Sequence, residues 1–343
     1  MIYPLIIKYK LYLILIGIFL VLFLLNKIRN LFHQEISKRF STAEEKATVK
    51  VDIFRKYIQV KPAQIVFDNP EKYYPYLANK IGKYVGSHQF KKLRTEIKFV
   101  FENFPENIFL NRLEPNRLKF GIDCFKKPLE LVIDDNFCNL RIIGNQGIGK
   151  TNISKICIQQ IKNNYKVYVL STKISDFDDF KNSNVDLLTP NKTEHLQNFL
   201  EITDELKEKI KKEQSCKIWL ILDEAIKDLT IDLYEKGTDR EDLKKKIVEN
   251  INYFLSLGRK FKLFLMLNTQ DENIKNSANL DLAKVGNFIC GRFSNETSAS
   301  FYGIPAELSQ RRDLTNGKLI LATQQNRECV VFKSYLFKKE GLK

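Results

Sequence analysis

The amino-acid sequence predicts a three-layer α/β fold, in which a mostly parallel sheet lies between two layers of helices. Two observations predict this core. From residue 119 onward, short apolar runs of strand type alternate with amphipathic runs of helix type. Residues 144–151 form a glycine-rich segment directly between one such strand and one such helix. A third observation, an unbroken apolar run near the amino terminus, adds one transmembrane helix and a small accessory region to the expected architecture.

The composition is that of a globular protein. Of the 343 residues, 44% are hydrophobic and 28% are charged, which excludes wholesale disorder and collagen-like structure. The six cysteines form no C-x-x-C pair and only three histidines are present, so neither a zinc module nor a disulfide scaffold is expected.

The net charge of +15 is concentrated in the first third of the chain. Residues 1–120 contain 21 lysines and arginines against 10 acidic residues. Anionic lipid headgroups or a phosphate backbone are the natural partners of such a surface, and a solvated lysine-rich surface is the alternative.

Residues 1–30 are expected to form a membrane anchor. The run from Leu11 to Leu25 is apolar throughout, and as a helix it would be about 22 Å long. Lys8 and Lys10 can extend their ammonium groups to the interface, so the helix with its upstream turn matches a hydrocarbon core of ~30 Å. No small-residue cleavage site follows, which favours an uncleaved anchor over a signal peptide. The basic residues after the run favour a single-pass protein of the cytoplasmic membrane with its remaining domains in the cytoplasm.

Residues 31–118 are expected to form a membrane-proximal linker and a small accessory region. Short apolar runs separated by prolines are typical of a small, irregular α/β unit. Its aromatic residues stand near lysines and could stack on nucleic-acid bases, but packing in a core is the preferred interpretation. These residues are Tyr73, Tyr74, Tyr76, Phe99 and Phe101.

Residues 144–151 match the phosphate-binding pattern G-x-x-x-x-G-K-[ST]. Glycines let backbone N–H groups turn toward an anion, because a Cβ would obstruct the positive φ angles of such a nest. Lys150 is expected to reach the β- and γ-phosphates of ATP, and the Thr151 hydroxyl to bind Mg²⁺. The flanking strand and helix are the context that this loop requires. The predicted nucleotide-binding residues are Gly144, Asn145, Gln146, Gly147, Ile148, Gly149, Lys150 and Thr151.

A second motif complements the loop. Residues 217–225, KIWLILDEA, form an apolar strand that ends in Asp223 and Glu224. Asp223 is expected to hold Mg²⁺ through water, and Glu224 to activate the attacking water as a general base. Together, the two motifs predict a RecA-like P-loop NTPase motor over residues 119–343.

A third motif narrows the class of ATPase. Neither an L-S-G-G-Q segment nor a guanine-reading N-K-x-D motif occurs, which leaves an additional-strand ATPase. Residues 257–270, LGRKFKLFLMLNTQ, put Arg259 before a buried strand and Gln270 at its end. This segment resembles the G-R-x-x-G-I-x-L-I-L-A-T-Q pattern of DNA translocases of the FtsK/HerA superfamily.

The resemblance extends to both sides of that motif. Residues 167–180 are similar to a strand-D-P-K segment of the superfamily, with Lys173 as its lysine. Residues 288–303 and 317–333 resemble the strand, serine-rich helix and closing hairpin of conjugative coupling proteins of the TcpA type. The departures are Ser171-Thr172 in place of Asp-Pro, Asn268 where Ala is usual, and Ile148 where a small residue is common.

The resemblance implies a membrane-anchored homo-oligomer, a hexameric ring that threads DNA through its centre and hydrolyses ATP between neighbouring subunits. In such a ring Gln270 would sense the γ-phosphate, and Arg259 would act as an arginine finger on the neighbour's nucleotide. For Arg259, a surface arginine that closes a helix is the alternative. Arg292 is a second candidate for the finger.

Residues 201–213 and 239–250 carry charges of both signs at i,i+4 spacing, and we expect them to be solvated faces of a small helical insertion. Contact of Lys244, Lys245 and Lys246 with DNA is the less favoured interpretation.

Two functions fit these observations. The favoured one is an ATP-dependent DNA translocase, a coupling protein that moves plasmid or mobile-element DNA to a membrane channel, with a relaxase or secretion-channel proteins as partners. The alternative is a phage or virion-assembly or secretion ATPase that drives extrusion through the membrane. The position of the anchor before the motor favours the first. A scaffold with a degenerate site is disfavoured, because Lys150, Thr151, Asp223 and Glu224 are all present.

Overall fold

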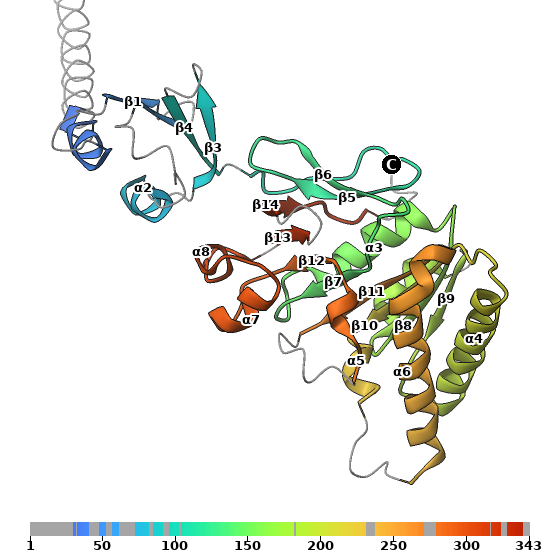
Figure 1. Cartoon of the computed structure of the whole chain (residues 1–343). Coiled ribbons are helices and arrows are strands. Elements are labelled where there is room, and N and C mark those ends of the chain that lie inside the picture. Colours follow the sequence, from blue (N-terminus) through green and yellow to red (C-terminus); the bar gives the residue numbers. More distant parts are fainter. Residues whose placement is uncertain are drawn as a thin grey trace, which may run out of the picture. The chain divides into compact units, whose positions relative to one another are not determined.

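The structure is a computed structural model of the chain (Figure 1). It describes residues 30–31, 33–40, 48–52, 57–61, 73–81, 85–91, 96–102, 104–181, 183–230, 237–270, 279–315, 317–323 and 328–338. The predicted membrane segment Leu11–Leu25 lies outside these residues. Within the ranges just given, no helix is long and apolar enough to cross a bilayer.

The chain divides into two compact units, Met1–Asn103 and Phe104–Lys343. This division precedes the boundary expected at residue 118. The difference arises because residues ahead of the first core strand already belong to the second unit. Phe109, for example, forms a β-bridge with Leu336 near the end of the chain.

The first unit is built on a four-stranded antiparallel sheet in the order β1-β2-β4-β3. Its core includes the buried Phe99 and Phe101, and the aromatic rings of residues 73, 74 and 76 pack against it. The prediction that these aromatic residues pack in a core is confirmed. The elements are β1 (Thr48–Asp52), β2 (Tyr57–Lys61), α2 (Tyr74–Ile81), β3 (Val85–Lys91), β4 (Glu96–Phe101) and a helix over residues 33–40.

The second unit contains a ten-stranded sheet in the order β6-β5-β14-β13-β12-β7-β11-β10-β8-β9. Neighbouring strands are parallel from β12 to β9 and antiparallel on the other side of β12. The strands are β5 (Arg117–Ile122), β6 (Pro128–Val132), β7 (Leu140–Ile143), β8 (Lys166–Ser171), β9 (Val185–Leu188), β10 (Ile218–Asp223), β11 (Leu263–Thr269), β12 (Asn287–Cys290), β13 (Lys318–Thr323) and β14 (Glu328–Ser334).

Strand β11 lies between β7, which leads into the glycine-rich loop, and β10, which ends in Asp223. This inserted strand is the one that an additional-strand ATPase requires. The predicted α/β fold with a RecA-like core is therefore confirmed. The expected closing hairpin is also present, as the antiparallel pair β13 and β14.

Helices cover both faces of the sheet (Figure 1). Helix α3 (Lys150–Ile161) packs on one face, and α4 (Thr193–Lys211) and α6 (Asp239–Leu257) pack together on the other. The sequence accounts for the layers, because β10 and β11 are buried along their whole length, as parallel strands covered on both faces require. The shorter elements are η3 (Ile174–Phe180), α5 (Ala225–Asp228), η5 (Gly258–Phe261), η7 (Leu282–Lys284), α7 (Glu296–Phe301) and α8 (Ala306–Ser309).

The prediction of a solvated helical insertion is wrong. Helices α4 and α6 are parts of the core layer, and each has an apolar stripe that includes Phe199 on α4 and Phe254 on α6, both fully buried. Lys244 is buried as well, and its Nζ donates a hydrogen bond to the carbonyl of Thr230 at 3.4 Å. Apart from Lys244, the charged residues that dominate the sequence of these helices lie outside the buried stripe.

Candidate nucleotide-binding site

The glycine-rich loop joins the carboxyl end of β7 to the amino end of α3. Its three glycines have positive φ angles of 150° at Gly144, 85° at Gly147 and 103° at Gly149. These conformations favour glycine and explain the spacing of the motif. At Gly144 a Cβ would also lie 2.3 Å from Cδ1 of Ile148, so Ile148 closes the back of the loop.

A cavity of about 550 Å³ opens beside the loop. Of the predicted nucleotide-binding residues, Gln146, Gly147, Gly149, Lys150 and Thr151 line it. The remaining three belong to the frame of the loop. Gly144 and Ile148 are buried behind it, and Asn145 contributes a backbone carbonyl to the contact described next.

Lys150 is almost fully buried and points along the loop. Its Nζ donates hydrogen bonds to the carbonyls of Gly144 at 2.8 Å and Asn145 at 3.2 Å. It also forms an ion pair with Oε1 of Glu224 at 3.0 Å. The predicted phosphate-binding cation and the predicted general base therefore meet at the mouth of the loop.

Glu224 reaches this position through an unusual backbone conformation. Its φ of 57° and ψ of 0° lie in the left-handed region, which non-glycine residues rarely adopt and which often marks a functional site. The turn ends β10 at Asp223 and starts the short helix α5. It separates the directions of the two acidic side chains, so that Glu224 faces Lys150 while Asp223 stays in line with its strand.

Asp223 is 2% exposed and lines the cavity with Thr151. Its Oδ1 accepts a hydrogen bond from Nδ2 of Asn268 at 2.6 Å, and its Oδ2 accepts one from Oγ of Ser171 at 3.1 Å. Burial raises the pKa of the Asp223 carboxyl, and these two hydrogen bonds act in the opposite direction. The Asp223 carboxylate and the Thr151 hydroxyl line the same cavity, and both are oxygen ligands of the kind that Mg²⁺ prefers. The residues present therefore fit this ion.

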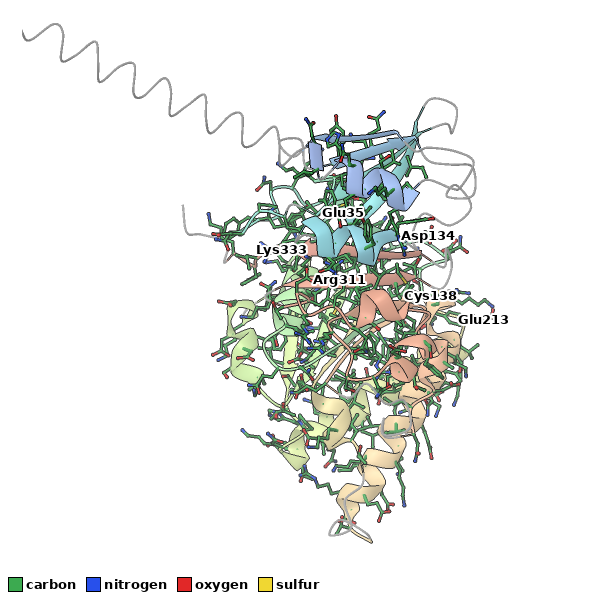
Figure 2. The ribbon with its side chains drawn as sticks, turned by 90° about the vertical axis from the view of Figure 1, so that its left-hand side faces the viewer. Glu35, Asp134, Cys138, Glu213, Arg311 and Lys333 are labelled. Carbon is green, nitrogen blue, oxygen red and sulfur yellow. The ribbon has the colours of Figure 1, made fainter. Side chains whose placement is uncertain are left out.

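The residues of the third motif lie in different places. Gln270 follows β11 and lines the cavity. Arg259 precedes β11, is exposed, and has its Nη1 3.9 Å from Sγ of Cys138, the residue shortly before β7. Because β7, β10 and β11 are parallel, Arg259 lies at the amino ends of these strands, whereas the phosphate loop lies at their carboxyl ends. In Figure 2, Cys138 and Glu213, which precede β7 and β10, lie on the same side of the molecule. Arg259 therefore does not contribute to the cavity of its own subunit.

Arg292 lies nearer to the loop. It follows β12, whose last residue is in register with the last residue of β7, and its side chain is exposed. Gly291 donates its backbone N–H to the carbonyl of Ile143, one residue before the loop. Lys173, the lysine of the strand-D-P-K resemblance, lines the cavity and is exposed.

Three residues that contact the site are not among the predicted site residues. Ser171 and Asn268 hold Asp223, and Asn152 lines the cavity while its side chain bonds to the backbone of Tyr335 and Phe337. Asn152 thus ties the helix after the loop to the segment after β14. In the sequence, Ser171 and Asn268 are marked only as polar residues near the end of otherwise apolar strands. That pattern becomes informative only when the register of the strands is known.

The fold and these residues define a P-loop ATPase with a RecA-like core and an additional strand. No protein-family model matches the chain, and no curated protein matches it either. Solved structures do match. The conjugation coupling protein TcpA of pCW3, in its monomer form with ATPγS, has a TM-score of 0.57 at 15% identity, over 90% of this chain and 94% of that one.

Two further ATPases have a similar fold over about two thirds of this chain. EssC (ATPases 2 and 3) from Geobacillus thermodenitrificans has a TM-score of 0.52 at 13% identity, over 68% of this chain and 47% of that one. EccC (ATPases 2 and 3) from Thermomonospora curvata, in complex with a signal sequence peptide, has a TM-score of 0.51 at 11% identity, over 70% of this chain and 45% of that one. This chain therefore spans less than half of each. The predicted resemblance to FtsK/HerA-type ATPases is confirmed at the level of the fold.

Proposed function

We propose that this protein is a membrane-anchored, ATP-dependent DNA translocase of the coupling-protein type. The observation that supports it most is the likeness to the fold of TcpA over 90% of this chain, which extends well beyond the P-loop motor itself. A likeness restricted to the motor would equally fit many P-loop ATPases.

ATP hydrolysis follows from the residues around the cavity. The backbone of the loop and Lys150 bind the β- and γ-phosphates, and Lys150 exchanges its ion pair with Glu224 for the phosphate oxygens. Once released, the Glu224 carboxylate accepts a proton from the attacking water. Thr151 and Asp223 would hold Mg²⁺, which would neutralise charge that develops on the phosphate oxygens. Gln270, which follows β11 and lines the cavity, would contact the γ-phosphate.

Oligomerisation completes the site in this proposal. Arg259 is exposed at the edge opposite its own cavity, so any role in hydrolysis requires that it reach a neighbouring subunit. A homo-oligomeric, hexameric ring offers such an arrangement, with one nucleotide between each pair of subunits and DNA in the central channel. Arg292, which is also exposed, is the competing finger residue.

The organisation of the chain fits transport at a membrane. In this proposal residues 1–30 are the anchor, the rest of the first unit up to residue 103 is the membrane-proximal region, and the second unit is the motor, which lies in the cytoplasm. The basic excess of residues 1–120 favours contact with anionic lipid headgroups or with the DNA itself. A relaxase and secretion-channel proteins are the expected partners of a coupling protein for plasmid or mobile-element DNA.

A second candidate is a secretion or virion-assembly ATPase that drives extrusion of protein through the membrane. The likeness of the fold to EssC and EccC favours it, because the EccC structure contains a signal sequence peptide. In that case the motor would act on a protein substrate and not on DNA.

Hydrolysis assays with DNA separate the two candidates. The full-length protein, purified in detergent, is assayed for ATP hydrolysis alone, with single-stranded DNA and with double-stranded DNA, with Lys150→Ala as the inactive control. Stimulation by one form of DNA is expected, and it names the substrate. Hydrolysis that is indifferent to both forms, in a sample shown to form rings, would support the secretion or assembly ATPase. Absence of hydrolysis in all three samples would contradict both.

A further inference from the structure

The Asp223 carboxylate lies in the middle of a row of in-register residues. Asp223 on β10 pairs with Ser171 on β8 and with Asn268 on β11, and all three strands are parallel. Side chains that are in register on parallel strands point to the same face of a sheet. This is the face that α3 covers, since Ile221 and Met266, two residues earlier, pack in the same cluster as α3.

The neighbours of Asp223 each donate to a different carboxylate oxygen. Asn268 donates to Oδ1 at 2.6 Å and Ser171 to Oδ2 at 3.1 Å, and both residues are fully buried. A carboxylate that is bonded through both oxygens to buried side chains on both sides has a fixed rotation about its side-chain bonds. The remaining accepting directions of its oxygens can then be presented to the cavity that Asp223 lines.

Asn268 is itself fixed from the helix side. Its Nδ2 also donates to Oγ of Ser154 on α3 at 2.6 Å, and Ser154 Oγ donates to the carbonyl of Lys150 at 3.3 Å. A continuous set of hydrogen bonds therefore connects the metal-binding carboxylate to the first residue of the helix that follows the phosphate loop. Within the described part of the chain, Oδ1 of Asn268 is buried and has no partner, so the side chain's hydrogen bonds are those that Nδ2 donates.

Ser171 and Asn268 are also two of the positions at which the chain departs from the pattern that it resembles, Ser for Asp and Asn for Ala. The two departures meet on one side chain. An aspartate at position 171 would put a second negative charge beside Asp223. An alanine at position 268 would leave Oδ1 of Asp223 without the hydrogen bond that Asn268 donates.

We propose that Ser171 and Asn268 are a pair of positioning residues that orient the Asp223 carboxylate for Mg²⁺–ATP. The inference rests on the proposed function, since it assumes that Asp223 takes part in binding the metal of a nucleotide complex. It predicts a defect specific to the metal. Outer partners of metal ligands typically change metal affinity or activity by about 10- to 100-fold when they are removed.

The test measures binding of a fluorescent ATPγS analogue to the full-length protein, once with Mg²⁺ and once with EDTA. For Asn268→Ala, the gain in affinity due to Mg²⁺ is expected to fall at least tenfold, while the affinity in EDTA stays within about twofold of the wild type. Ser171→Ala is expected to show the same pattern, and Ser171→Thr, which keeps the hydroxyl, to retain the gain.

Asn250→Ala is the matched control. Asn250 is also buried and also donates two hydrogen bonds from Nδ2, to Thr203 and Asp204, but it lies on α6 away from the cavity. This variant is expected to leave the Mg²⁺-dependent gain unchanged. Thermal melting of each variant accompanies the binding data, so that a loss of folding is recognised.

The proposal would be overturned if the Asn268→Ala and Ser171→Ala proteins fold and Mg²⁺ still increases their affinity for the analogue as much as it does for the wild type. An equal loss of affinity in Mg²⁺ and in EDTA would also overturn it, because that pattern indicates a general structural role. A wild-type protein that binds the analogue equally with and without Mg²⁺ would contradict the proposed metal site itself, and is recognised before any variant is compared.

Discussion

Lys150 Nζ lies 3.0 Å from Glu224 Oε1, so the predicted phosphate-binding lysine and the predicted general base form one ion pair. Neither residue can perform its role while the pair persists, because the lysine must contact phosphate and the glutamate must accept a proton from water. The pair also holds the loop and the end of β10 together. Binding of ATP phosphates therefore competes directly with Glu224 for Lys150.

Replacement of Glu224 with Gln tests this competition. Glu224→Gln keeps the shape of the side chain but removes the negative charge, so Lys150 is released for the phosphates and ATP affinity is expected to rise. Hydrolysis is expected to fall by about 10²- to 10⁴-fold, because the general base is lost. Equilibrium binding and single-turnover hydrolysis measure the two effects separately.

Glu208→Gln serves as its control, since Glu208 pairs with Lys211 on the exposed face of α4. It is expected to change neither quantity. Retention of hydrolysis within tenfold of the wild type in Glu224→Gln would remove the role of general base.

Arg259→Ala tests the arginine finger. If Arg259 acts on the neighbour's nucleotide, turnover of the assembled ring is expected to fall by about 10³- to 10⁵-fold while nucleotide binding is kept. Mixed rings of Arg259→Ala and Glu224→Gln subunits are expected to regain part of the activity, because some interfaces then combine an intact base with an intact finger. Steady-state hydrolysis across mixing ratios measures this.

Arg292→Ala, assayed beside it, decides between the two candidates. A loss below tenfold for Arg259→Ala, together with a large loss for Arg292→Ala, would transfer the role to Arg292.

Gly144→Ala tests the packing of the phosphate loop. Both the positive φ and the 2.3 Å approach to Ile148 oppose a methyl group there, and a cost of about 3 kcal/mol in unfolding free energy is expected. Gly303 also has a positive φ, 70°, but a Cβ would meet nothing within 4 Å. Gly303→Ala should therefore cost only about 1–2 kcal/mol. Urea unfolding compares the two variants, and equal costs would contradict the close packing of Ile148 on the loop.

The Arg311–Asp313 pair predicts a pH-dependent contribution to stability. Arg311, labelled in Figure 2, is buried and donates to both carboxylate oxygens of Asp313, at 3.0 and 2.8 Å, and Lys318 also bonds to Asp313. Burial alone would raise the pKa of the Asp313 carboxyl, but the bonds from Arg311 and Lys318 outweigh it and lower the pKa. A lowered pKa means that the stabilisation is present above the ordinary carboxyl range and is lost as the pH falls through the lowered value.

Asp313→Asn is therefore expected to cost about 2 kcal/mol near neutral pH, and the difference from wild type should shrink below about pH 4. Urea unfolding at several pH values measures it. Asp178→Asn breaks an exposed pair with Lys181 and should cost less than about 1 kcal/mol. A cost for Asp313→Asn that is independent of pH would contradict the ionic origin of the effect.

Local patterns in the sequence predicted the parts of the fold that depend on neighbouring residues. The glycines of the phosphate loop, the apolar strand before Asp223 and the strand before Gln270 all lie where their motifs indicated. The burial of helices α4 and α6 is not evident from the sequence, because most of their charged residues lie on the outer face while a narrower apolar stripe decides their burial.

The neighbours of Asp223 could not be predicted, because they depend on strand order and register. Ser171 lies on β8 and Asn268 on β11, and only the order β11-β10-β8 brings both to the same carboxylate. In the same way, a contact of Arg259 with a neighbouring subunit's nucleotide would depend on how subunits assemble, which the sequence of one chain does not specify.

Displacement of streptavidin from the end of DNA tests the central claim, ATP-driven movement along DNA, most directly. Full-length protein is incubated with end-biotinylated single-stranded or double-stranded DNA that carries streptavidin, with ATP or with ATPγS. ATP-dependent displacement from at least one form is expected for the wild type, and none for Lys150→Ala or with ATPγS. A protein that binds DNA and hydrolyses ATP but leaves streptavidin on both forms would contradict the proposal.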